Sequence, residues 1–206
     1  MQLFLLPLIL LASEIKLPKV ETGDMSLEEA IKRRRSVRSY EKTELTLQQL
    51  SQLLWASQGI TDSVREFRSA PSAGSLYPLK VYLIKRDGIF EYIPSSHSIV
   101  KKVDGDKRGE LCKAALWQSF IKEAPVSFVI TAIYERTTVK YRERGIRYVH
   151  IEVGHSAQNI HLEAVALGLA SVPVGAFKDD EVKKVLSLPP SEEPLYIIPV
   201  GYARGQ

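Results

Sequence analysis

The sequence predicts an α+β fold in which a central mixed β-sheet is flanked by helices. Some segments, such as 46–59, repeat apolar residues at helical spacing, whereas others, such as 125–134, are short, β-rich and almost wholly apolar. In a parallel βαβ fold, helical and strand segments would alternate regularly, and here they do not. We therefore expect one sheet with helices on its faces.

The first half of the chain predicts two capped helices and a hairpin. Ser26 followed by Glu29 opens a helix through SLEEAIKRR (26–34), and Thr46 with Gln49 opens a second one that ends at Gly59. Residues 79–93 alternate in hydrophobicity around Asp87–Gly88, which predicts a β-hairpin.

The second half predicts further helices and strands in mixed order. Residues 106–122 fit a helix, and 125–134 fit a central strand. Apolar residues at helical spacing predict a long helix over 148–169. Trp55 and Trp117 are expected in the core or in an interface. The remaining expectation is two strands, 171–177 and 194–202, that flank a short helix starting near Asp179.

Composition describes an ordinary globular protein. The 206 residues carry a net charge of +4, with 45% hydrophobic and 25% charged residues, which dictates no particular partner. The single cysteine, Cys112, excludes an internal disulfide and fits a reducing, cytoplasmic location. A single asparagine beside abundant Lys, Arg and Glu is a thermophile tendency.

The N-terminus predicts a lead-in of residues 1–24 before one domain of residues 25–206. The apolar run 3–12 is too short for a membrane span, lacks a preceding basic residue and is interrupted by Pro7. It reads as a segment packed on the body or on a partner, or as an over-extended start. Export through a degenerate signal remains the alternative.

Four stretches carry candidate chemistry. RRRSVRSY (33–40) concentrates guanidinium groups that suit a phosphate dianion, although an isolated basic run is more often a solvated face. SAPSAGSLYPLKVY (69–82) contains a small-residue loop that lets a flat ligand approach the backbone. VPVGAF (172–177) and PVGYARG (199–205) end strands with small residues and a further arginine.

Taken in order, these stretches resemble the nitroreductase-like FMN-dependent flavoprotein superfamily, and within it the SagB-type dehydrogenase branch. The resemblance covers residues from about 25 to the end. Its pieces are RRRSVRSY, LLWASQGIT (53–61), APSAGSLYP (70–78), KYRERGIRY (140–148), GHSAQNIHLEAVALGLA (154–170), VPVGAFKDD (172–180) and EPLYIIPVGYARG (193–205).

The resemblance implies FMN bound without covalent attachment at the interface of an intertwined homodimer. Arg204 matches the basic residue that completes the phosphate site. The other residues that match flavin-binding positions are Arg34, Arg35, Ser36 and Arg38 in the N-terminal segment, Ser72, Ala73, Gly74 and Ser75 in a loop that reaches the ring from the partner, and Val174, Gly175 and Ala176 at a strand end.

The implied activity is hydride transfer through flavin N5 between a donor such as NADH or NADPH and a small organic acceptor, by a ping-pong scheme. Classical members carry asparagine where Ser75 stands and glutamate where Gly175 stands, so the usual NAD(P)H-driven nitro reduction is in doubt. Lys140 and Tyr141 match a catalytic Lys-Tyr pair of azoline dehydrogenases. A basic surface loop explains that pair equally well.

Three alternatives complete the expectations. The chain could be an azoline-type dehydrogenase or oxidase of a peptide or small heterocycle, or a non-catalytic flavin-binding protein. A nucleic-acid binder is not expected, because the basic runs lack interleaved aromatic residues. His150, His155 and His161 are spaced five and six apart, which does not suit a metal site on one helix.

Overall fold

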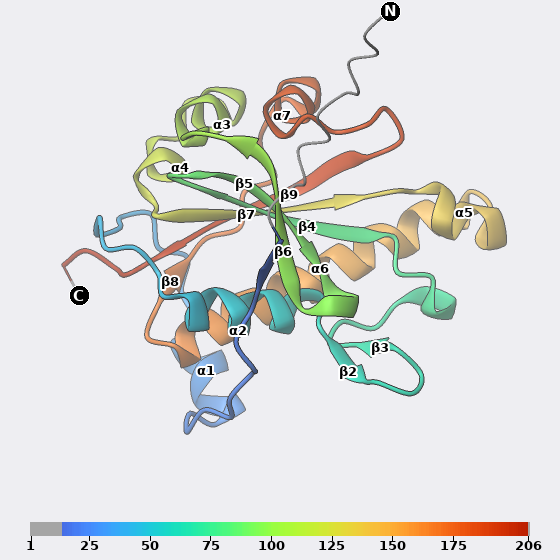
Figure 1. The fold of residues 1–206 in the computed structure, drawn as a ribbon, viewed down its shortest axis with the longest axis horizontal. Helices are drawn as coiled ribbons and strands as arrows, with labels where there is room; N and C mark the ends of the chain where they lie inside the picture. Colours follow the sequence, from blue (N-terminus) through green and yellow to red (C-terminus); the bar gives the residue numbers. More distant parts are fainter. Residues whose placement is uncertain (1–13, 206) are drawn as a thin grey trace, which may run out of the picture.

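The computed structural model describes residues 14–205, so the apolar run 3–12 lies outside the described residues. One seven-stranded sheet forms the centre, in the order β1-β6-β5-β4-β7-β9-β8 (Figure 1). Its strands are β1 (Glu14–Lys16), β4 (Leu79–Lys85), β5 (Gly88–Ile93), β6 (Ser98–Asp104), β7 (Val126–Ala132), β8 (Ala170–Ser171) and β9 (Glu193–Gly201). A separate pair joins β2 (Ile60–Asp62) to β3 (Phe67–Arg68).

Every strand pair among the described residues is antiparallel. The expected mixed sheet is therefore an antiparallel one in this chain. Parallel pairing occurs at the isolated bridge between Ser36 and Ser171. The α+β class and the flanking helices are confirmed.

Helices cover both faces of the sheet (Figure 1). The α-helices are α1 (Leu27–Arg33), α2 (Leu47–Gln58), α3 (Arg108–Ala114), α4 (Ser119–Glu123), α5 (Glu135–Tyr141), α6 (Arg144–Ala166) and α7 (Asp179–Leu186). Two short 3-10 helices, η1 (Ala73–Ser75) and η2 (Pro94–Ser96), lie in loops.

The two faces of the sheet carry separate cores. Along β4, Leu79, Val81 and Leu83 point into the core that includes α2 and α6. Tyr82 and Ile84 point into the core that includes α3 and α7. This alternation follows from the two-residue period of a strand, and it explains why the central strand β7 is buried at all seven positions.

The predicted hairpin and the second capped helix are confirmed. β4 and β5 join through a turn at Arg86 and Asp87, and Thr46 and Gln49 form the complete capping box of α2. At the first predicted helix, the Ser26 side chain accepts the backbone N–H of Glu29 at 3.2 Å. The long helix α6 starts at Arg144. The sequence predicts a start at 148, because the Arg-rich first turn has no apolar pattern.

Two predictions about elements are wrong. The helix expected over 106–122 is broken into α3 and α4 by left-handed backbone at Leu116 and Trp117. Trp117 is 71% exposed, so it does not lie in the core of this chain, and its expected place in an interface stays a prediction. The strand expected over 171–177 shrinks to β8 and an isolated bridge from Val174 to Ile197. Pro173 explains this, since it has no N–H to donate to a ladder.

Candidate functional site

The N-terminal arginines lie where α1 ends. Arg34 is the C-cap, and its backbone N–H still donates to Ala30 O at 3.0 Å. Beyond it the chain is not helical, so Arg34 and Arg38 do not share a helical face. Instead Val37 N–H donates to Ser171 O at 3.1 Å, which fixes this segment beside β8.

The C-terminal arginine lies beside the same segment. Tyr40 and Ala203 form an isolated bridge, and Arg204 N–H donates to Ser39 O at 3.0 Å. The Arg204 guanidinium donates to Tyr40 O at 2.5 Å and lies 3.9 Å from the Glu123 carboxylate. We call Arg34, Arg35, Arg38 and Arg204 the arginine group.

Positive charge in the arginine group is largely uncompensated. Among the described residues, Arg34, Arg35 and Arg38 form no ion pair with a carboxylate. Arg35 donates to the carbonyls of Lys32 and Arg34, and Arg38 lies 5.9 Å from the centroid of the Phe120 ring. Guanidinium groups in such an arrangement suit a phosphate, which they can bind in bidentate fashion.

His161 is buried beside the arginine group. Its Nδ1 lies 2.7 Å from Ser171 Oγ, and its buried Nε2 has no hydrogen-bond partner among residues 14–205. Burial, and next the charge of Arg34, lower the pKa of His161 to about 4. The imidazole is therefore neutral at physiological pH and adds no charge to the group. This burial is typical of a residue that packs in the core.

The strand end with Val174, Gly175 and Ala176 lies along β9. Val174 exchanges backbone hydrogen bonds with Ile197 at 2.8 and 3.0 Å, whereas Gly175 and Ala176 are exposed. A Cβ on Gly175 would approach the Tyr196 ring to 3.7 Å, an ordinary contact. The chain's own packing therefore does not require glycine there.

The small-residue loop meets α5. We call residues 72–77 the Gly74 loop. Gly74 has φ +63°, and a Cβ on it would lie 2.8 Å from Tyr141 Oη and 3.0 Å from Lys140 Nζ. The structure thus brings together the two sets predicted separately, Ser72 to Ser75 and the Lys-Tyr pair. The pair ends a helix and does not belong to a loop.

These two sets of residues lie at opposite ends of the molecule. The Gly74 loop and α5 are near the first turns of α6, where Tyr141 packs edge-on against Tyr148 with ring centroids 5.1 Å apart. The arginine group lies near His161, towards the other end of α6 (Figure 1). At 1.5 Å per residue, the helix separates Tyr148 from His161 by roughly 20 Å. One chain therefore does not bring all predicted residues into one site.

Sequence reasoning missed a buried polar cluster next to the Gly74 loop. Glu152 on α6 is 2% exposed, Gln58 on α2 is 1% exposed, and Arg68 on β3 donates to Gln58 Oε1 at 3.1 Å. The sequence contains one sign of this cluster: the carboxylate at 152 stands between the apolar positions 149 and 153 of a helix.

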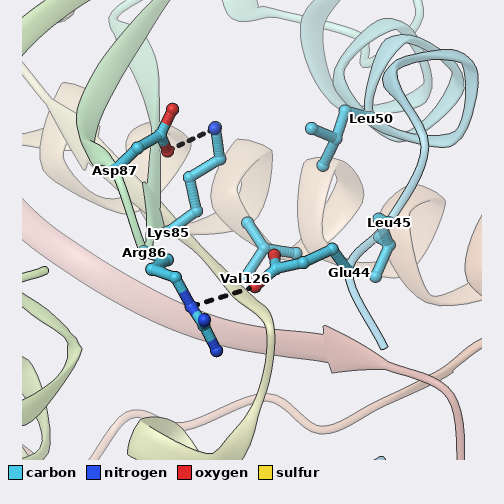
Figure 2. A pocket seen from close by; sticks show the side chains of 7 residues that line it. All are labelled: Glu44, Leu45, Leu50, Lys85, Arg86, Asp87 and Val126. Atoms are coloured by element: carbon cyan, nitrogen blue, oxygen red, sulfur yellow. Dashed lines mark hydrogen bonds and ion pairs between the residues drawn. The ribbon is translucent and has the colours of Figure 1, made fainter. Parts of the chain in front are cut away.

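One further hollow contains none of the predicted residues (Figure 2). It lies between the β4–β5 turn and the start of α2, and its charged groups are already paired. Arg86 Nε lies 3.5 Å from Glu44, and Lys85 pairs with Asp87. In the described part of the chain, no cluster of three or more His, Cys, Asp or Glu could hold a metal, and no helix is long and apolar enough to cross a membrane.

Comparison with known proteins decides the family. A model of the nitroreductase family matches residues 31–202. The chain belongs to the nitroreductase family. A protein of Methanocaldococcus jannaschii named as a nitroreductase is 48% identical over 194 residues, which cover 91% of this chain and 96% of the relative. The microcin B17-processing protein McbC of Escherichia coli is 25% identical over 72% of this chain and 58% of its own.

Solved structures of nitroreductases share the fold. A protein of Ralstonia eutropha described as a nitroreductase superposes with a TM-score of 0.86, at 28% identity, over 94% of this chain and 90% of its own. The NADPH:FMN oxidoreductase of Vibrio harveyi, solved with NAD+, has a TM-score of 0.65 at 20% identity, over 86% of this chain and 69% of its own. The resemblance drawn from the sequence motifs is thereby confirmed at the level of the family.

Proposed function

We propose that this oxidoreductase of the nitroreductase family depends on FMN and moves hydride equivalents between NADH or NADPH and a small organic acceptor. The observation that carries the proposal is the uncompensated arginine group. A phosphate dianion supplies the charge that Arg34, Arg35 and Arg38 lack among the described residues. Ser36, beside them, adds a hydroxyl donor.

The remaining residues fit the flat part of the same ligand. Exposed Gly175 and Ala176, after Val174, offer backbone that a planar ring can approach. On a second copy of the chain, the Gly74 loop with Ala73 and Ser75 offers a similar surface. Bound FMN would accept a hydride equivalent at N5 and pass it to the acceptor, so the protein need supply no nucleophile.

Lys140 and Tyr141 are proposed to handle protons at this ring. Their polar ends both lie within reach of Gly74, so a ligand held against the loop would meet an ammonium group and a phenol together. Either group can donate a hydrogen bond to a reacting oxygen or nitrogen or exchange a proton with it.

A homodimer follows from the separation of the two sets. If the arginine group and the Gly74 loop both contact one flavin, they come from different copies, because α6 holds them apart in one chain. A twofold dimer would then build two equivalent sites, each completed by the partner.

One alternative has support of its own. An azoline-type dehydrogenase or oxidase would use the same flavin site to oxidise a ring in a peptide or small heterocycle. The identity with McbC, which is named for processing microcin B17, favours it. So does the proximity of Lys140 and Tyr141 to Gly74. A substrate ring would then reduce the flavin where a nicotinamide does not.

The test compares three single arginine variants. We expect Arg34→Ala and Arg204→Ala to weaken FMN binding about tenfold or more, as loss of a charge-assisted hydrogen bond does. Arg33→Ala is the matched control. It removes the same charge at an adjacent residue, whose guanidinium already pairs with Glu29 at 2.5 Å. FMN fluorescence titration measures the affinity. Equal affinity in all three variants would refute the phosphate assignment.

A further inference from the structure

A second, smaller hollow is lined by residues of α2, β3, β4, β5 and α5. Its volume is about 160 Å³, which is room for roughly five water molecules at about 30 Å³ each. No residue of the arginine group or of the Gly74 loop lines it. Its charged and amide side chains are those of Gln58, Arg68, Lys80, Glu91 and Arg136. We call it the Arg68 hollow.

The Arg68 hollow carries an excess of positive charge. Lys80 pairs with Glu91 at 2.8 Å and with the buried Glu192 at 3.1 Å, so these carboxylates are already neutralised. Among the described residues, by contrast, Arg68 and Arg136 form no ion pair with a carboxylate. The two guanidinium groups therefore leave positive charge that an anion could balance.

The buried carboxyl group of Glu152 does not cancel this charge. In the part of the chain that the structure describes, it pairs with neither Arg68 nor Arg136. Burial raises the pKa of Glu152 to about 7, so a large part of it is protonated at neutral pH.

Gln58 supplies a buried donor that lacks an acceptor. This residue is 1% exposed, and its Oε1 accepts from Arg68 Nη1 at 3.1 Å. The amide cannot be turned over, because that would set donor against donor. Among the described residues, nothing then accepts from Gln58 Nε2. A buried N–H without an acceptor is unfavourable, so we expect an oxygen atom of a ligand to accept from it.

The two arginines also contact the end of the Gly74 loop. The Arg68 guanidinium lies 4.5 Å from the centroid of the Tyr77 ring, and Arg136 donates to the Tyr77 carbonyl at 3.2 Å. Tyr77 has φ +45°, a conformation that persists only where the surroundings enforce it. Each guanidinium has five N–H donors, so both arginines keep donors for an anion. An anion between them would also stabilise this end of the loop.

We propose that the Arg68 hollow binds one small oxyanion through Arg68, Arg136 and Gln58 Nε2. The ligand is a phosphate or sulfate ion, or the carboxylate group of a larger molecule, since each presents oxygen atoms that such donors bind. The inference goes beyond the proposed function, because the hollow needs neither FMN nor the arginine group.

Two sources of the oxyanion fit the position of the hollow. Arg136 and Lys140 stand four residues apart on α5, so they lie on one face of the helix, about 6 Å apart along its axis. The carboxylate of an acceptor held against Gly74 could therefore reach the hollow. A free ion would bind there alone and act on the loop through Tyr77.

The first test follows the hollow directly by NMR. The purified protein is titrated with inorganic phosphate at constant ionic strength, and we expect a saturable shift of the Gln58 side-chain amide and of Arg68 Nε–H. Arg136→Gln should weaken the affinity about tenfold or more, as loss of a charge-assisted hydrogen bond does. Arg142→Gln is the matched control. It removes the same charge from an exposed arginine at the end of α5 that does not line the hollow.

A second variant tests the unpartnered donor. Gln58→Glu places a carboxylate oxygen where Nε2 lies, so the variant supplies its own oxyanion to Arg68. Phosphate affinity, followed at Arg68 Nε–H, should fall about tenfold or more. Because Arg136 is exposed, the Arg136→Gln variant decides the question even if Gln58→Glu does not fold.

Benzoate and benzamide, titrated in the same way, separate the two sources. Tighter binding of benzoate than of phosphate, with no shift from uncharged benzamide, would assign the hollow to a carboxylate of a larger molecule. Tighter binding of phosphate would assign it to a free ion.

Three results would overturn the inference. Neither phosphate nor benzoate could give a saturable shift at Gln58 and Arg68, or the affinity in Arg136→Gln could equal that of the wild type. Phosphate could also shift only resonances of the arginine group, which would place the anion there. Failure of the proposed function is distinguishable, because no step of these titrations uses flavin. If the protein binds no FMN, that proposal falls, while the titrations still decide whether the hollow binds an oxyanion.

Discussion

Two buried ionisable residues of α6 have opposite effects on stability as the pH changes. Burial raises the pKa of Glu152 to about 7 from 4.5, so the folded state binds its proton more tightly than the unfolded state does. Burial and Arg34 lower the pKa of His161 to about 4 from 6.5, so there the unfolded state binds the proton more tightly. Between the folded and unfolded pKa values of each residue, raising the pH therefore lowers the free energy of unfolding through Glu152 and increases it through His161.

Neutral variants should separate the two contributions. Relative to wild type, Glu152→Gln should gain stability between pH 5 and pH 8, by roughly 1–3 kcal/mol, because the penalty for ionising a buried carboxyl group disappears. His161→Gln should change in the opposite direction, and gain relative stability as the pH falls from 6.5 to 4. Urea unfolding at the two ends of each range measures both. If both variants gained stability relative to wild type as the pH rises, or both as it falls, the directions given for these two pKa values would be contradicted.

At the scale of single elements, α2 is the helix whose start is best specified. The Thr46 side chain accepts the Gln49 N–H at 3.2 Å, and Gln49 Oε1 accepts the Thr46 N–H at 2.9 Å. Thr46→Ala should therefore lower the free energy of unfolding by about 1 kcal/mol. Ser26→Ala should cost less, since α1 has seven residues, of which only Ala30 is buried. Chemical denaturation measures both, and a larger loss at Ser26 would contradict the comparison.

Elements with a strong local pattern could be predicted from the sequence. The hairpin, β7 and α2 follow from alternation, an apolar run and a capping box. The break between α3 and α4 could not be predicted, because Leu116 and Trp117 are ordinary helix residues that nevertheless have left-handed backbone, with the Trp117 N–H donated to Cys112 O at the end of α3. The strand β6, which lies between β1 and β5, is not predicted, because its lysines interrupt the apolar pattern.

The candidate site shows the same limit. Motifs indicated which residues to consider, but not that Gly74 meets Tyr141, which lies far away in the sequence. Nor could they show that Glu152 is buried, because a lone carboxylate on a helix is usually solvated. Contacts of this kind depend on the packing of α5 and α6, and helical periodicity carries no information about them.

At the scale of the whole molecule, the separation of the arginine group from the Gly74 loop predicts complementation between subunits. One variant would carry Arg34→Ala with Arg38→Ala, and the other would carry Gly74→Phe, which places a bulky side chain where Lys140 and Tyr141 lie. Each alone should bind no FMN. Mixed dimers formed by co-expression should recover flavin in about a quarter of all sites, because each heterodimer has one intact site. No recovery in confirmed heterodimers would place both sets in the same chain's site.

The central claim is that this chain is an FMN-dependent oxidoreductase. The most direct measurement is the visible spectrum of the purified protein after incubation with FMN and removal of free flavin, before and after anaerobic addition of NADH or NADPH. We predict protein-bound flavin bands that bleach when the nicotinamide is added. Bound flavin that stays oxidised would contradict nicotinamide as the donor and favour the azoline-type alternative. Protein that retains no flavin would contradict the claim itself.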